Sequence, residues 1–194
     1  MSTELAAIVQ PGTHGIARIE HRCPDKLAVM RAAFRGQLLS QRTLTTLFVG
    51  SCMMMSDGDE EWRSNSRFMH RANGDVLIAG LGIGMVLTKV LPKPDVRTVT
   101  VIEKHADVIA LVAPAFPDPK LKIVHADIFE WKPEKGQKWD TIYFDIWPDI
   151  CTDNLPGMAM LHRKFARTLY RANPKCWMGS WQRDYLRAQK RRGY

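Results

Sequence analysis

Short apolar runs alternate with segments of helical periodicity through the middle of the chain. Apolar, β-branched runs predict four buried strands, at residues 75–79, 98–103, 122–125 and 141–145. Between them, apolar residues at helical spacing predict a helix over 85–91, which Pro92 ends, and another over 106–113. Strands that alternate with helices favour parallel pairing with right-handed crossovers. We therefore expect an α/β fold with a Rossmann-like, doubly wound and mostly parallel sheet.

The pattern before residue 71 is different and richer in strand signals. The predicted elements are a strand at 15–20, a helix at 26–34, a hairpin of 44–49 with 52–55, and a helix at 60–71. We expect residues 1–70 to form a small β-rich lead-in and residues 71–194 to form the Rossmann-like domain.

Three further elements are predicted near the C-terminus. A helix over 155–172 has Asp153 or Asn154 in position to cap it. Residues 176–181 predict one more strand, and 183–192 predict a basic helix. Little chain remains to add strands, so we expect the sheet to be C-terminally shortened.

Composition places the chain among globular proteins, because 45% of its 194 residues are hydrophobic and 25% are charged. No apolar run approaches the roughly 20 residues of a membrane helix, and the N-terminus lacks a signal-peptide pattern. We expect a cytoplasmic protein that does not bind membranes. The four cysteines are scattered along the chain, at Cys23, Cys52, Cys151 and Cys176. This spacing predicts reduced thiols rather than a disulfide framework or a metal site.

The formal net charge is +8, and much of the excess lies near the C-terminus. The residues concerned are Arg183, Arg187, Lys190, Arg191 and Arg192. Such a segment could bind nucleic acid or an acidic partner, or it could be a solvated helix face. The sequence leaves both interpretations open, and it leaves a homo-oligomer open as well.

A glycine loop follows the first strand of the Rossmann-like segment. Gly80, Gly82 and Gly84 have the spacing G-x-G-x-G and lead into a helix. Glycine allows a tight turn and a close approach of the backbone to a ligand, and the helix N-terminus favours an anionic group. Met85 occupies the position of the last glycine in the nicotinamide fingerprint G-x-G-x-x-G. The alternative is a plain tight turn without a ligand.

Two carboxylates follow the next two strands. Glu103 lies about 20 residues beyond the glycine turn, where a carboxylate can accept hydrogen bonds from both ribose hydroxyls. Asp127 can accept a hydrogen bond from the exocyclic amine of adenine, and Ile128 can supply an apolar wall. An ordinary surface glutamate and a helix N-cap aspartate are the corresponding structural alternatives.

The segment after the fourth strand carries the candidate catalytic residues. Asp145 could orient a nucleophilic amine or take its proton. Trp147 could stack on a planar group or contact a cationic one, and Asp149 could help to shape the acceptor pocket. The structural alternatives are a core aromatic for Trp147 and a turn residue for Asp149.

With these features in this order, the chain resembles the class I S-adenosylmethionine-dependent methyltransferases, and more closely their spermidine synthase-like branch. The resemblance spans about residues 44–150 and rests on the glycine loop, the run 99–103, the run 127–130 and the run 139–145. It implies that Gly80, Gly82, Gly84, Glu103, Lys104, Asp127, Ile128 and Asp145 bind S-adenosylmethionine. It also implies that Asp145 faces the reacting groups.

The chain departs from the aminopropyltransferases of that branch at three places. Ile83 occupies the position of the loop aspartate that holds the amino group of the donor. A glutamine of the preceding hairpin falls among residues 52–54. The Asp-Ser-Ser-Asp of the family reads as residues 145–148, so its second carboxylate is missing or shifted to Asp149.

From these features we expect an S-adenosylmethionine-dependent methyltransferase of unknown acceptor, either an amine or, given the basic C-terminus, nucleic acid. Methyl transfer requires the protein chiefly to align donor and acceptor and to exclude water. One alternative is a spermidine synthase-like aminopropyltransferase that uses decarboxylated S-adenosylmethionine. Another is a non-catalytic S-adenosylmethionine-binding module, and Met85 disfavours a nicotinamide-dependent dehydrogenase.

Overall fold

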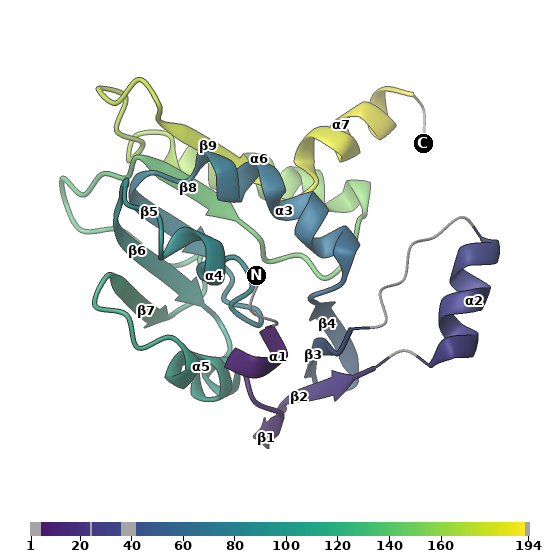
Figure 1. Cartoon of the computed structure of the whole chain (residues 1–194). Coiled ribbons are helices and arrows are strands. Elements are labelled where there is room, and N and C mark those ends of the chain that lie inside the picture. The colour runs from purple at the N-terminus through teal and green to yellow at the C-terminus, as the bar shows by residue number, and fades with distance from the viewer. Residues whose placement is uncertain (1–4, 24, 36–41, 193–194) are drawn as a thin grey trace.

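The main sheet has five strands that are all parallel, in the order β7-β6-β5-β8-β9 (Figure 1). The structure, a computed structural model, describes residues 5–23, 25–35 and 42–192. The strands are β5 (Gly74–Ala79), β6 (Val96–Glu103), β7 (Leu121–His125), β8 (Thr141–Phe144) and β9 (Trp177–Ser180). From β5 the chain adds β6 and β7 on one side, and it then adds β8 and β9 on the other side of β5. This confirms the predicted Rossmann-like, doubly wound parallel sheet.

Helices cover both faces of this sheet, and alternate residues of β5 point to the two faces. Val76 and Ile78 pack with residues of α3 (Asp59–Arg71), α4 (Leu87–Val90) and α5 (Ala106–Val112). Leu77 and Ala79 belong to a second buried cluster with residues of α6 (Leu155–Phe165). Burial on both faces explains why β5 reads as a continuous apolar run rather than an alternating one.

A second, antiparallel sheet precedes the main one in the chain and lies beside it (Figure 1). Its strands are β1 (Gly12–His14), β2 (Ala17–Arg22), β3 (Leu44–Val49) and β4 (Cys52–Ser56). The predicted hairpin is confirmed as β3 and β4, with Gly50 in the left-handed region at φ 59°. Asp107 of α5 joins the two parts, because it pairs with His14 at 2.9 Å and accepts the Ile16 N–H at 3.1 Å.

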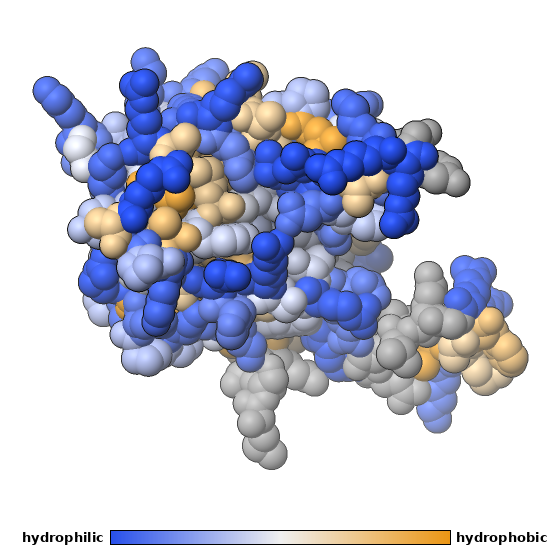
Figure 2. Space-filling model, turned by 90° about the horizontal axis from the view of Figure 1, so that it is seen from above, coloured by the Kyte–Doolittle hydropathy of each residue, from blue (hydrophilic) through white to orange (hydrophobic). Residues whose placement is uncertain are grey.

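The two helices nearest the N-terminus differ in how they pack against the rest of the structure. The short α1 (Leu5–Ile8) was not predicted, and Leu5 is buried in the core. The predicted α2 (Lys26–Phe34) is confirmed as a helix, but it projects away from both sheets (Figure 1). Its apolar side chains at positions 27, 30 and 34 are exposed, and the space-filling view shows it standing apart as well (Figure 2).

The C-terminal elements differ from the prediction in two details. The helix α6 ends at Phe165 rather than 172, because the main chain of Thr168 and Tyr170 then pairs with Trp139, at 2.8 and 2.7 Å. Asn154 does not cap α6, since its side chain donates to Asp149 instead. A single turn, η2 (Thr152–Asn154), precedes the helix, and α7 (Arg183–Arg191) is confirmed. Within the described ranges no helix is long and apolar enough to cross a membrane.

Candidate functional site

A cavity of about 480 Å³ lies at the carboxyl ends of β5, β6 and β8. The strand order reverses between β5 and β8, and open parallel sheets place their ligands at such a point. The hairpin β3–β4, the first turn of α3 and Trp181 complete the wall. The cavity brings together most of the predicted site residues: Gly80, Gly82, Glu103, Lys104, Asp127, Ile128, Asp145 and Trp147.

The glycine loop forms the floor of the cavity. Other atoms of the chain pack so closely against Gly80 and Gly82 that these two positions require glycine. Gly80 and Gly82 have φ of 96° and 51°. A Cβ on Gly80 would overlap the main-chain oxygen of Asp145, and one on Gly82 would overlap the Met55 sulfur. Side chains at these positions would therefore be both strained and obstructed.

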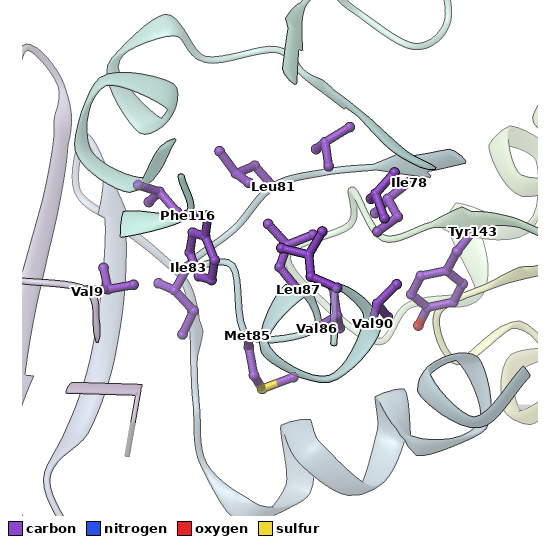
Figure 3. Close-up of a cluster of buried hydrophobic side chains, with 14 of the residues drawn as sticks. Val9, Ile78, Leu81, Ile83, Met85, Val86, Leu87, Val90, Phe116 and Tyr143 are labelled. Atoms are coloured by element: carbon purple, nitrogen blue, oxygen red, sulfur yellow. The ribbon is translucent and has the colours of Figure 1, made fainter. Parts of the chain in front are cut away.

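The last part of the loop belongs to the core instead of the cavity. Gly84 has φ 71°, and a Cβ there would overlap the Phe116 ring. Ile83 is fully buried, in the apolar cluster that also holds Phe116 and Val9 (Figure 3). Gly84 does not line the cavity, and the side chain of Ile83 cannot contact a ligand in it.

Glu103 is buried and joins the glycine loop to the start of α5. One carboxylate oxygen accepts the Leu81 N–H and the other accepts the His105 N–H, both at 2.8 Å. Glu103 is only 6% exposed, so it is not an ordinary surface glutamate. Each oxygen has a second lone pair, which leaves the carboxylate able to accept hydrogen bonds from a ligand diol.

Asp127 is held as a charged carboxylate at the edge of the cavity. Its Oδ2 pairs with Lys104 Nζ at 2.9 Å, and its Oδ1 accepts the Phe129 N–H at 2.9 Å. The hydrogen bond from Lys104, followed by that from Phe129, holds the pKa of Asp127 below its usual range. A turn follows Asp127 in place of the helix that an N-cap would require.

Asp145 presents a carboxylate to the cavity that accepts no hydrogen bond from the part of the chain the structure describes. Its pKa is raised well above the usual value, first by burial and then by the negative charge of Glu61. Trp147 lines the cavity beside it. Asp149 is exposed outside the cavity, where its carboxylate accepts a hydrogen bond from Asn154 at 3.1 Å.

Glu61 is a residue of the cavity that sequence reasoning missed. It lies in the first turn of α3, and its Oε1 accepts a hydrogen bond from Asn65 Nδ2 at 3.0 Å. Burial is the main cause that raises the pKa of Glu61. Glu61, Asn65 and Phe68 follow helical spacing on the buried face of α3. This spacing was the available signal for a carboxylate that faces inward.

Comparisons with known proteins agree with the fold. No protein-family model matches the chain. Polyamine aminopropyltransferase 1 of Streptomyces coelicolor is 32% identical over 138 residues, which are 64% of this chain and 24% of that protein. Polyamine aminopropyltransferase of Sodalis glossinidius is 32% identical over 105 residues, which are 50% of this chain and 35% of that protein. The matched part therefore spans about a third or less of these relatives.

The solved structure of spermidine synthase from Thermotoga maritima is similar with a TM-score of 0.50 and 20% sequence identity. The similarity covers 83% of this chain and 52% of that one, and at this identity it concerns the fold.

Proposed function

We propose that the chain is an aminopropyltransferase. It has the fold of the spermidine synthase-like branch of the class I S-adenosylmethionine-dependent methyltransferase superfamily. It would bind decarboxylated S-adenosylmethionine in the cavity and transfer the aminopropyl group to an amine. The observation that carries this proposal is the carboxylate of Asp145, which faces the cavity beside Glu61 without a hydrogen-bond partner in the described chain.

The residues of the cavity fit a nucleoside of this kind. Gly80 and Gly82 line the cavity without side chains, so that the backbone would allow a ligand to approach closely. Glu103 would accept hydrogen bonds from the ribose, and Asp127 would accept one from the adenine amine. The buried Ile128 would contact the base. When bound, the sulfonium of such a nucleoside supplies an activated alkyl group, so the protein needs no nucleophile of its own.

Asp145 would then hold and deprotonate the amine that receives the alkyl group. An amine attacks only in its neutral form, so a proton must leave the ammonium before or during transfer. A carboxylate with a raised pKa takes a proton more readily than an ordinary aspartate does. Trp147 would exclude water from this end of the cavity and contact the cationic amine through its ring face.

The sequence pattern predicts methyl transfer, whereas two observations favour aminopropyl transfer instead. The named relatives with 32% identity are aminopropyltransferases. Four carboxylates line the cavity, Glu61 and Asp145 among them, and both partners of aminopropyl transfer carry ammonium groups. Methyl transfer is the second candidate, favoured by Ile83 in the core and by Asp149 outside the cavity.

The test is product analysis with both donors. The protein is incubated with decarboxylated S-adenosylmethionine and putrescine, and methylthioadenosine is measured by mass spectrometry. A parallel reaction with S-adenosylmethionine is analysed for S-adenosylhomocysteine. Methylthioadenosine that depends on putrescine supports the proposal, whereas S-adenosylhomocysteine alone supports methyl transfer. Tight binding of donors without either product would indicate a binding module.

A further inference from the structure

Helix α7 carries a row of cations that the proposed function does not use. Its basic residues are Arg183, Arg187, Lys190 and Arg191. Because an α-helix turns by about 100° per residue, these four positions fall within about 100° of one another around its axis and form one basic stripe. The last three of them are exposed. Strongly hydrophilic residues line the part of the molecule that holds α7 (Figure 2).

The charges of the basic stripe are not neutralised. Its cations form no ion pair with any carboxylate whose position the structure describes. The acidic residue of α7, Asp184, pairs with Arg67 of α3 instead. Burial and, next to it, the positive charge of Arg187 lower the pKa of Arg183. Cations four positions apart on a helix repel each other, and an anionic partner would relieve this repulsion.

Helix α7 has a fixed position on the body of the protein. Leu186 is fully buried, and the ion pair between Asp184 and Arg67 joins α7 to α3. Just before the helix, Trp181 Nε1 donates a hydrogen bond to Ser64 Oγ of α3 at 2.9 Å. The basic stripe is therefore a fixed row of charges. Because Leu186 is buried, it is not available to enter a lipid bilayer, as the apolar face of a membrane-bound helix must.

A fixed row of cations fits a ligand whose negative charges are also arranged in a row. From Arg183 to Arg191 the helix rises by about 12 Å. One strand of a nucleic acid carries a phosphate about every 3.4 Å of its axis, so several phosphates can lie along the basic stripe. Arginine, the main residue of the stripe, binds phosphate through two parallel hydrogen bonds. The net charge of +8 adds attraction at longer range.

We propose that the basic stripe of α7 binds the phosphate backbone of a nucleic acid without reading its sequence. Contacts with phosphates position a protein on a nucleic acid but carry no sequence information. The proposal goes beyond the proposed function and does not depend on it, because no residue of the stripe lines the cavity at β5, β6 and β8. Binding of this kind releases counterions and therefore weakens steeply as the salt concentration rises.

The test measures binding of short labelled nucleic acids by fluorescence anisotropy over a range of salt concentrations. The probes are single-stranded DNA, single-stranded RNA and duplex DNA, which together identify the kind of nucleic acid that binds best. The variant carries Arg187→Gln, Lys190→Gln and Arg191→Gln. Loss of three phosphate contacts should weaken binding about tenfold or more, and it should reduce the slope of log affinity against log salt by about 2–3.

A matched control removes three positive charges from another part of the chain. It carries Arg167→Gln, Arg171→Gln and Lys175→Gln, which are exposed and precede β9, whereas α7 follows the other end of this strand. This control should keep most of the native affinity. Circular dichroism checks the fold of both triple variants. The single change Arg187→Gln, should the triple variant of α7 not fold, is expected to reduce the slope by about 1.

Three results would overturn the proposal. An equal loss of affinity in the control would mean that only the overall charge matters. Equally tight binding of polyglutamate would mean that the stripe does not select phosphates and that an acidic protein is the better partner. A native protein that binds none of the three probes at low salt would have no such surface. Each of these results is independent of the products that the protein forms from decarboxylated S-adenosylmethionine.

Discussion

At the scale of single residues, Asp127 shows how a site carboxylate is kept charged. Lys104 and the Phe129 N–H stabilise its anionic form, so it stays a hydrogen-bond acceptor well below neutral pH. Its side chain is 24% exposed and lies at the cavity edge, so its removal would open no void in the buried core.

Asp127→Ala is therefore expected to weaken methylthioadenosine binding without unfolding the protein. A lost hydrogen bond should cost about 0.5–3 kcal/mol of binding free energy. Calorimetry measures the loss, and circular dichroism checks the fold. Lys104→Met serves as the control, because it removes the ion pair and keeps the acceptor. Native affinity in a folded Asp127→Ala protein would rule out its role toward adenine.

A substitution at Asp145 tests catalysis rather than ligand binding. Asp145→Asn keeps the shape but cannot take a proton, so turnover is expected to fall by roughly 10²–10⁴ while methylthioadenosine affinity changes little. Because burial and Glu61 raise the pKa of Asp145, native activity should increase with pH as this group deprotonates. Steady-state rates across pH measure both effects. A selective loss of donor binding would place the carboxylate on the donor instead.

At the scale of elements, the sequence predicted most of the architecture because burial leaves a periodic trace. β5 between two helical layers reads as an apolar run, and the hairpin reads as two runs around Gly50. The end of α6 was missed because pairing of Trp139 with residues 168–170 overrides helical periodicity. Glu61 was missed because it belongs to a run of acidic residues at 57–61. Which of these side chains points inward depends on the residue at which the helix begins.

His162 connects two of these elements and should make stability depend on pH. The Nε2 of His162 lies 2.9 Å from Ser180 Oγ of β9. Burial is the main cause that lowers the pKa of His162 to about 4. The positive charges of Arg183 and Arg187 also lower this pKa, whereas the negative charge of Asp184 raises it. Between pH 4 and 6.5 the unfolded chain binds more protons at this residue, so stability falls as pH falls through this window. His162→Gln should reduce that slope in urea unfolding, and an unchanged slope would contradict the prediction.

At the scale of the whole molecule, the cavity joins the two sheets. Leu47, Val49 and the methionines of β4 form one wall, and residues after β5, β6 and β8 form the other. A ligand bound there holds both parts in the native arrangement, and binding to the native state alone stabilises it by mass action.

Methylthioadenosine at 100 times its dissociation constant should therefore stabilise the fold by about 2.7 kcal/mol. For a chain of this size that corresponds to a rise in Tm of roughly 5–10 °C. Thermal unfolding followed by circular dichroism measures the shift. Asp127→Ala, at the same ligand concentration, should show a smaller one. A native protein whose Tm does not respond to this ligand would contradict the assignment of the cavity.

The hydrogen bond from the Leu81 N–H to the Glu103 carboxylate, 2.8 Å long, ties the glycine loop to the end of β6. A loop held in this way would not need to order before a nucleoside binds, so association would not wait for that step. The Leu81 amide is also buried, with the residue 4% exposed. In hydrogen–deuterium exchange this amide should be slow in the free protein, whereas a loop that orders only on binding would exchange rapidly there.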